Sequence, residues 1–206
     1  MPRRKPQRGR ERYSVFLNIP YDDGFKKLYL AYIAGISAFG LVPRATLEIP
    51  TSKRRLDRII GLIDQCTYSI HDLSRVQLDR NAPSTPRFNM PFELGLAVAL
   101  DKSRGHERWY VCESLRRRVN KSLSDLDGTE VHIHGGNVRG VFAALGDMFI
   151  RRPRQPSLRQ MYEVYRALSR SLPTIMHDAG TRDPYRARVF RDLVLAARAE
   201  QLRLAQ

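Results

Sequence analysis

Hydrophobic positions along the chain alternate between two periods, one typical of strands and one typical of helices. Short apolar runs predict five strands, at residues 13–19, 41–48, 67–73, 108–113 and 129–135. Apolar residues at helical spacing predict four helices, which follow the first, second, third and fifth strands, at residues 25–40, 52–66, 91–103 and 137–150. Such alternation predicts an α/β fold with a parallel sheet covered by helices on both faces. We expect the flavodoxin-like strand order 2-1-3-4-5 with right-handed crossovers.

Single residues in this pattern support more specific predictions. Gly40 follows the last apolar position of the first helix and is expected to end it. Pro43 predicts an edge position for the second strand, because proline cannot donate a hydrogen bond to a neighbouring strand. Residues 74–88 are polar, contain two prolines and are expected to form a loop. The helix at residues 52–66 should bury one face, formed by Leu56, Ile59, Ile60 and Ile63.

The pattern changes after Ile150, where RRPRQP interrupts it and a helical C-terminal extension follows. Asp183 and Pro184 predict the start of the second extension helix, with the aspartate as N-cap and the proline in the first turn. The extension either packs on the core or presents its apolar stripe to a partner or a second copy. We divide the chain into a disordered basic arm (1–12), an α/β domain (13–150) and the extension (151–206). The stripe of the first extension helix consists of Leu158, Met161, Tyr165, Leu168 and Leu172.

Composition adds limits on size and compartment. With 206 residues, of which 42% are hydrophobic, the chain can bury a full core. The two cysteines, Cys66 and Cys112, suggest no disulfide framework and favour a reducing compartment. We find neither a signal peptide nor an apolar run of membrane-spanning length, and we therefore expect a cytoplasmic protein without a membrane partner.

The net charge of +15 is concentrated at the two ends of the chain. Residues 1–12 carry +5 and residues 151–206 carry +7, whereas residues 13–150 carry only +3. Basic ends attract phosphate-rich partners in a salt-dependent way, so nucleic acid or a partner protein is expected there. The alternative is that the arginines serve only solubility.

Candidate chemistry lies after the strands, since parallel sheets bind ligands outside the carboxyl ends of their strands. The sequence contains neither a dinucleotide-binding nor a P-loop glycine motif, and no serine hydrolase motif. His132 and His134 alternate on a strand without further metal ligands, so we expect them to be structural and predict no cofactor and no metal. The strand ends contribute Asn18, Tyr21, Asp22, Asp23, Glu48, His71, Asp72 and Glu113. The loop after the third strand leads into Arg87, Phe88, Asn89 and Glu93.

Glu93 places a carboxylate at the start of an apolar helix, and two explanations are open. It could interact with the helix dipole in the first turn. Alternatively, the sequence LGLAVAL that follows suggests a helix buried nearly all round, in which Gly95 lets a ligand or another backbone approach. A carboxylate in such a place can stabilise a cationic transition state at a sugar C1′, or attack that carbon directly.

The segments HDLSRV (71–76) and FNMPFELGLAVAL (88–100) resemble those of nucleoside 2-deoxyribosyltransferase-like proteins and the related bacterial TIR-like domains. The resemblance covers residues 13–150. It implies that Glu93, in ELGLA, is the nucleophilic glutamate and that Asp72 is the strand-end acid. The transferases carry a further acid before the glutamate where this chain has Arg87, Phe88 and Asn89, and the resemblance therefore implies hydrolysis rather than base transfer.

These observations predict a hydrolase of N-glycosidic bonds in a nucleotide, NAD or a nucleoside, with Glu93 and Asp72 as catalytic residues. The resemblance also implies a role in an antiphage or toxin system, in which many bacterial members of these families act, and we expect a homo-oligomer. The alternative is a non-catalytic module that senses a nucleotide or binds nucleic acid or a partner. Several residues also have structural alternatives: Asp72 could cap its loop, and Asp22, Asp23 or Asn89 could cap helices. The expected substrate-binding residues are Asn18, Tyr21, Asp22, Asp23, Arg87 (for a phosphate), Phe88 and Asn89.

Overall fold

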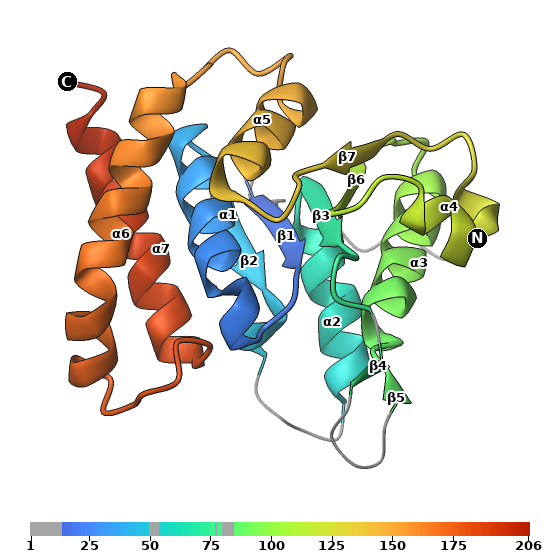
Figure 1. The fold of residues 1–206 in the computed structure, drawn as a ribbon, viewed down its shortest axis with the longest axis horizontal. Coiled ribbons are helices and arrows are strands. Elements are labelled where there is room, and N and C mark those ends of the chain that lie inside the picture. Colours follow the sequence, from blue (N-terminus) through green and yellow to red (C-terminus); the bar gives the residue numbers. More distant parts are fainter. Residues whose placement is uncertain (1–13, 50–53, 77, 80–84) are drawn as a thin grey trace, which may run out of the picture.

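The computed structural model describes residues 14–49, 54–76, 78–79 and 85–206, so the predicted basic arm lies outside the described residues. Five parallel strands form one sheet in the order β2-β1-β3-β6-β7, which confirms the predicted flavodoxin-like order (Figure 1). The strands are β1 (Ser14–Asn18), β2 (Val42–Ala45), β3 (Tyr68–Asp72), β6 (Trp109–Glu113) and β7 (Val131–Ile133).

Helices cover both faces of the sheet, because side chains alternate between its faces along each buried strand. In β1, Val15 and Leu17 join the apolar cluster of α1 and α5, whereas Phe16 packs with α2 and α3. The principal helices are α1 (Lys26–Ala38), α2 (Arg55–Gln65), α3 (Asn89–Lys102), α5 (Val138–Met148), α6 (Leu158–Asp178) and α7 (Ala187–Arg203). Shorter helices are η1 (Asp23–Phe25), η2 (Thr46–Glu48), α4 (Arg118–Ser122) and η3 (Ser124–Leu126).

Two predictions made from single residues are confirmed, the end of the first helix at Gly40 and the edge position of the strand that contains Pro43. Gly40 has a φ of 74°, in the left-handed region that glycine adopts without strain. Its N–H donates to the Ser37 carbonyl at 2.8 Å, and the Leu41 N–H donates to the Ile36 carbonyl at 3.2 Å, which closes α1 as a Schellman motif. The strand with Pro43 lies at the edge of the sheet, as expected.

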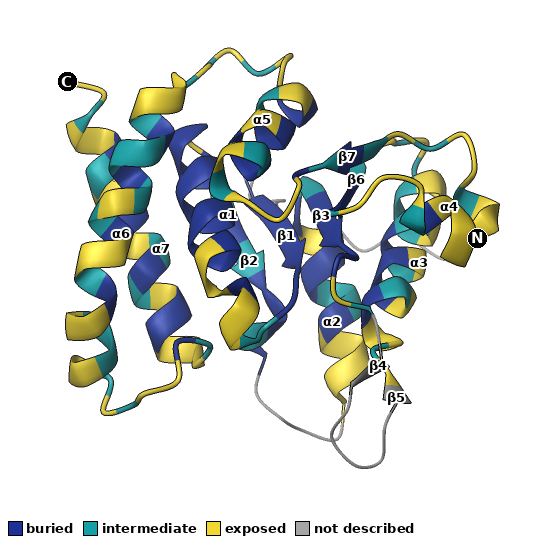
Figure 2. Cartoon of the chain, in the orientation of Figure 1, coloured by how far each residue is buried: buried dark blue, intermediate teal, exposed yellow. Residues whose placement is uncertain are grey.

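Three local predictions are wrong. Leu56 does not belong to the buried face of α2: its side chain is 46% exposed, and Ile59, Leu62 and Ile63 form that face instead. The N-terminal end of α2 is exposed (Figure 2), so its first turn has nothing to pack against. Residues 74–88 are not entirely a loop, since β4 (Leu78–Asp79) and β5 (Thr85–Pro86) form a short antiparallel pair. Helix α3 is not buried nearly all round, because Phe92, Gly95 and Ala99 are exposed.

The C-terminal helices pack on the core. Helices α6 and α7 lie beside α1 (Figure 1), and their apolar stripes share its hydrophobic cluster except at Leu158, which is 40% exposed. This settles the choice left open by the sequence for these buried faces. The predicted start of α7 is wrong: Asp183 does not cap it, and the helix begins at Ala187 after a turn at Pro184 and Tyr185. Within that turn, Asp183 Oδ1 accepts a hydrogen bond from the Tyr185 N–H at 2.9 Å.

Two glycines of α5 give a matched test of how closely this helix approaches the backbone that follows β7. A Cβ at Gly140 would lie 2.0 Å from the His134 carbonyl oxygen, whereas a Cβ at Gly146 meets no atom within 4 Å. We expect Gly140→Ala to lower the free energy of unfolding by about 1–3 kcal/mol through overpacking. Gly146→Ala should raise it by about 0.5–1 kcal/mol, because alanine favours helix. Urea unfolding of both variants checks this, and equal effects would contradict the tight contact.

Candidate functional site

A cavity of about 600 Å³ lies beyond the carboxyl ends of β1 and β2. The loops after these strands, the N-terminal parts of α2 and α3 and the turn between α6 and α7 surround it. This is the edge of the sheet at which parallel α/β proteins bind ligands, and the volume suits a nucleotide-sized molecule. The lining residues are Tyr21, Thr46, Leu47, Ile49, Arg55, Ile59, Asn89, Phe92, Glu93, Asp183, Tyr185, Arg186 and Ala187.

Glu93 is the buried acid of this cavity. Its side chain is 7% exposed, and its carboxylate forms no hydrogen bond or ion pair with any residue that the structure describes. Burial raises the pKa of Glu93 to about 7, although the charge of Arg55 acts in the opposite direction. As the fifth residue of α3, Glu93 lies beyond the first turn and does not cap the helix. A buried carboxyl without a partner is costly to the fold, which makes it a candidate for chemistry.

Gly95 contributes no close approach near this acid. A Cβ built on Gly95 meets nothing within 4 Å, so the glycine does not make room for a ligand or another backbone. The buried residues of α3 are Met90, Glu93, Leu94 and Ala97, at helical spacing. The carboxylate therefore enters the cavity from the buried face of an otherwise half-exposed helix.

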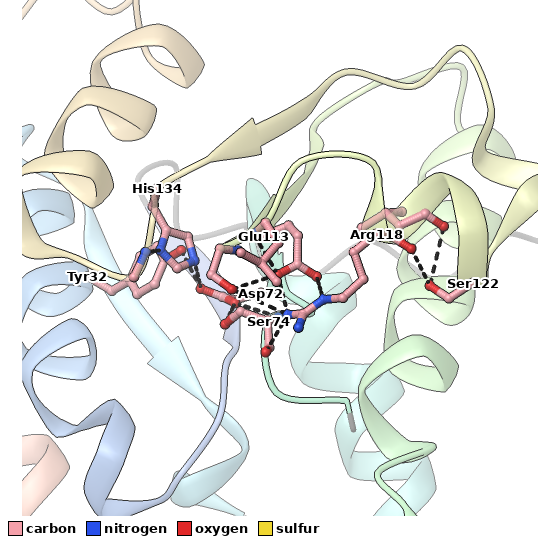
Figure 3. Close-up of polar contacts among 11 residues, drawn as sticks. Tyr32, Asp72, Ser74, Glu113, Arg118, Ser122 and His134 are labelled. Carbon is pink, nitrogen blue, oxygen red and sulfur yellow. Dashed lines mark hydrogen bonds and ion pairs between the residues drawn. The ribbon is translucent and has the colours of Figure 1, made fainter. Parts of the chain in front are cut away.

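Asp72, the second predicted catalytic residue, is fully buried and fully hydrogen-bonded (Figure 3). Its Oδ2 accepts from the Tyr32 hydroxyl at 2.8 Å and lies 3.0 Å from His134 Nε2. Its Oδ1 accepts from the Ser74 N–H at 2.9 Å and the Ser74 hydroxyl at 2.5 Å. Asp72 does not line the cavity. The structure thus separates Asp72 from the cavity that Glu93 lines.

The protonation of this cluster follows from its hydrogen bonds. The Gly136 N–H donates to His134 Nδ1 at 3.0 Å, which leaves the proton on Nε2, facing Asp72. Burial would raise the pKa of Asp72, but the bonds from His134 and Ser74 outweigh it, and the pKa lies below its usual value. Asp72 therefore holds together three elements, α1, β3 and the segment after β7.

Glu113, at the end of β6, is also satisfied. Its Oε2 accepts from Arg118 Nε at 2.8 Å, and its Oε1 accepts from the Ser114 hydroxyl at 3.0 Å. Arg118 Nη2 also donates to the Ser74 carbonyl at 2.5 Å, which links this pair to the Asp72 cluster (Figure 3). Of the buried acids at this edge of the sheet, Glu93 is the one that has no polar partner among the described residues.

Asn18, a predicted substrate contact, instead anchors α3. Its Nδ2 donates to the Met90 carbonyl at 2.8 Å and to His71 Nδ1 at 3.1 Å. Burial lowers the pKa of His71 to about 3, so this ring is neutral and can accept that bond. Asn18 thereby holds the first turn of α3 on the sheet, three residues before Glu93.

Asp22 and Arg87 bond to each other rather than lining the cavity. Asp22 Oδ1 caps η1 by accepting from the Phe25 N–H at 3.2 Å. Arg75 Nη2 lies 3.1 Å from Asp22 Oδ1, and Arg87 Nη1 lies 3.0 Å from Asp22 Oδ2. These contacts tie the loop after β1 to the segment that leads into α3.

The remaining predicted binding residues divide into two groups. Tyr21 and Asn89 line the cavity with Glu93. Asn89 is the first residue of α3 rather than its N-cap, which is Phe88. Asp23 and Phe88 are exposed, the latter at 69%, and do not line it.

Sequence reasoning missed Arg55 and the turn between α6 and α7. The Tyr185 hydroxyl donates to the Asp22 carbonyl at 2.5 Å, and its ring lies 5.7 Å from that of Tyr21. The Tyr29 hydroxyl in turn donates to the Pro184 carbonyl at 3.3 Å. Nothing in the sequence signals this contact, because it joins residues more than 150 positions apart.

The residues that the structure describes include neither a cluster of metal ligands nor a membrane-spanning helix. Among the described residues, no three His, Cys, Asp or Glu side chains gather closely enough to hold a metal ion. The helices of the described ranges include none that is long and apolar enough to cross a membrane.

No model of a known protein family matches the chain, and neither the curated proteins nor the solved structures contain a match to it.

Proposed function

We propose that this protein hydrolyses the N-glycosidic bond of a nucleotide, NAD or a nucleoside, with Glu93 as the catalytic carboxylate. The observation that supports this most directly is a carboxyl group that is buried, unpartnered among the described residues and in contact with a nucleotide-sized cavity. The resemblance of HDLSRV and FNMPFELGLAVAL to deoxyribosyltransferase-like and TIR-like proteins supports the same reaction and the same glutamate.

The reaction breaks the bond between C1′ of the ribose and a nitrogen of the base. The electron pair of that bond leaves with the base, and the oxygen of a water molecule bonds to C1′ and loses a proton. The base of a nucleoside or nucleotide takes up a proton as it leaves, whereas the cationic ring of NAD becomes neutral nicotinamide without one. Positive charge develops on the sugar in between. The Glu93 carboxylate stabilises this charge or bonds to C1′ until water displaces it.

Tyr21 and Asn89 line the cavity with Glu93 and can orient such a substrate. Burial raises the pKa of Tyr21 far above its usual value, so its hydroxyl remains protonated and the ring offers an apolar face. Asn89 presents an amide at the start of α3, and an amide both donates and accepts hydrogen bonds. We assign base stacking to Tyr21 and a polar substrate contact to Asn89. Asp72 acts from a distance, by holding the sheet together.

The pKa of Glu93 sets the expected pH dependence. Because the ionised carboxylate is the form that stabilises positive charge, kcat/KM for base release should rise with pH and level off above about pH 8. The midpoint should lie near the Glu93 pKa of about 7. A profile measured from about pH 5 to pH 9 tests this, and a rate that falls across the same range would contradict an ionised Glu93.

The proposal is tested by incubating the pure protein with NAD, the common nucleosides and 5′-nucleotides, and short nucleic acids. Released base is then separated and quantified by chromatography. Release of a base from any of these compounds supports the reaction. Absence of release from all of them, with or without candidate partners, would contradict it and leave the cavity as a nucleotide-binding site.

A second candidate function, binding of nucleic acid, is favoured by the outer faces of α6 and α7. Seven arginines are exposed on these two helices, whose buried faces pack on the core: Arg159, Arg166, Arg170, Arg188, Arg191, Arg198 and Arg203. If this surface contacts phosphates, affinity for a duplex or single strand should fall steeply as salt concentration rises. An affinity that does not depend on salt would contradict this use of the surface.

A further inference from the structure

Two arginines border the cavity that contains Glu93, and neither was among the residues expected from the sequence. Arg55 is the first residue of α2, and Arg186 follows the turn between α6 and α7. They reach the same cavity from elements that are 131 positions apart in the chain. We propose that Arg55 and Arg186 form a phosphate subsite, so that the substrate is a phosphorylated nucleotide rather than a nucleoside. This inference rests on the proposed function for the sugar and the base of that substrate.

Arg55 is held in place by the backbone and keeps donors for a ligand. Its Nη1 donates to the Ile49 carbonyl at 3.0 Å, at the end of the segment that follows β2. Its Nε and Nη2 bond no residue in the described part of the chain, and it forms no ion pair there with Glu93. A guanidinium anchored at one nitrogen, with two others available, can offer a phosphate a forked pair of hydrogen bonds.

Arg186 is arranged in a similar way. Its Nε lies 3.4 Å from Asp183 Oδ2, while its Nη atoms bond none of the described residues. Asp183 lines the cavity too, but its Oδ1 accepts the Tyr185 N–H and its Oδ2 faces Arg186. The turn itself is fixed, because the Tyr185 hydroxyl donates to the Asp22 carbonyl and the Tyr29 hydroxyl donates to the Pro184 carbonyl. The second cation therefore sits on a held segment of chain.

The charges around the cavity suit a ligand that is negative at one end. Two acids line it: Asp183, whose oxygens are both engaged, and Glu93, which is buried on α3. A phosphate between the arginines would leave the sugar carbon to face Glu93. Arg87, the phosphate ligand expected from the sequence, is paired with Asp22 outside the cavity and does not compete for this role.

The experiment measures binding without turnover, in a Glu93→Gln background. Isothermal titration would compare adenosine, guanosine, cytidine and uridine with their 5′-monophosphates. We expect a monophosphate to bind at least about tenfold more tightly than its nucleoside. Arg55→Gln or Arg186→Gln should each weaken monophosphate binding about 10- to 100-fold, the range for losing a hydrogen bond to a charged group, and leave nucleoside binding unchanged.

Matched controls lie on the same two segments of the chain. Arg58→Gln removes an exposed arginine from α2, and Arg182→Gln removes one from the turn between α6 and α7; neither residue lines the cavity. Both controls should preserve the preference for the monophosphate. Because Arg186 is exposed, its variant should fold even if Arg55→Gln, which loses a bond to Ile49, does not.

The proposed subsite is overturned if nucleosides bind as tightly as their monophosphates, if both arginine variants keep the preference, or if none of the eight compounds binds. These results are separate from the fate of the proposed reaction. Phosphate-dependent binding without base release by the protein with Glu93 intact would remove the reaction and keep the subsite. Equal base release from nucleosides and nucleotides would keep the reaction and remove the subsite.

Discussion

Glu93→Gln is expected to reduce base release by about 100- to 1,000-fold, the loss seen when one electrostatic contact to a transition state is removed. Glutamine has nearly the same shape as glutamate, so the cavity and the packing of α3 should remain. What disappears is the negative charge that would stabilise the ribosyl cation. The loss should therefore appear in kcat more than in KM, because the contact is made mainly in the transition state.

The same substitution should stabilise the protein, which separates loss of chemistry from loss of fold. Burial raises the pKa of Glu93 from 4.5 to about 7, so between these two values the unfolded chain is ionised while the folded protein holds a proton. Stability therefore falls as pH rises through this window. By linkage the cost above about pH 8 is at most roughly 3 kcal/mol, and Glu93→Gln should recover part of it.

Urea unfolding at about pH 5 and pH 8 measures this difference, which should be present at the higher pH and small at the lower one. Glu107→Gln, at an exposed position in the loop after α3, is the matched control and should change neither stability nor base release. Unchanged base release in Glu93→Gln would refute the catalytic assignment. A variant less stable than wild type at the higher pH would refute the absence of a partner for this carboxylate.

Asp72→Asn is expected to have the largest effect on stability, a loss of about 3–5 kcal/mol, because at least two hydrogen bonds to a buried charged group, each worth about 1.5–3 kcal/mol, cannot be replaced. Asparagine keeps one acceptor oxygen but cannot satisfy the donors of Tyr32, His134 and Ser74 together. Urea unfolding of the variant measures the loss. Asp125→Asn, at an exposed position in η3, should change stability by less than about 0.5 kcal/mol.

The change of stability with pH gives a second, independent test of the Asp72→Asn prediction. Since the pKa of Asp72 is lower in the folded protein than its ordinary value of 3.8, its contribution is complete above that value. The contribution is lost as pH falls through the folded pKa. Wild type should therefore lose more stability than Asp72→Asn on acidification below about pH 4. If Asp72→Asn instead retained full stability and lost base release alone, Asp72 would be a catalytic residue after all.

Most of the fold could be predicted from the sequence because segments with the strand period and segments with the helix period alternate along residues 13–150, with the polar stretch 74–88 between two of them. Periodicity shows which side of a helix is apolar, but it does not show how much of that side the neighbouring elements cover. Leu56 illustrates this limit, since it has the right spacing and yet lies in the exposed first turn of α2. The start of α7 was misplaced for a related reason: Asp183 caps a turn, and turns and helices begin with the same residue types.

The candidate site was only partly predictable, and strand geometry explains why. Successive side chains of a strand point to opposite faces of the sheet. Asp72 shares a face with Ile70 and therefore with α1, whereas His71 and Asn18 face α3 and Glu93. The alternation alone could have separated Asp72 from Glu93. No such rule places Arg55 and Arg186 at the same cavity, since their positions there depend on how the C-terminal helices pack.

The turn between α6 and α7 has a consequence for how the protein is made. The ribosome synthesises the chain from its N-terminus, so early segments can begin to fold before later ones have been made. All five strands and Glu93 precede residue 134, whereas the wall formed by Asp183–Ala187 comes near the end of the chain. A nascent chain therefore contains Glu93 well before its cavity can form, and the site is complete only after α6 and the turn that follows it have been made.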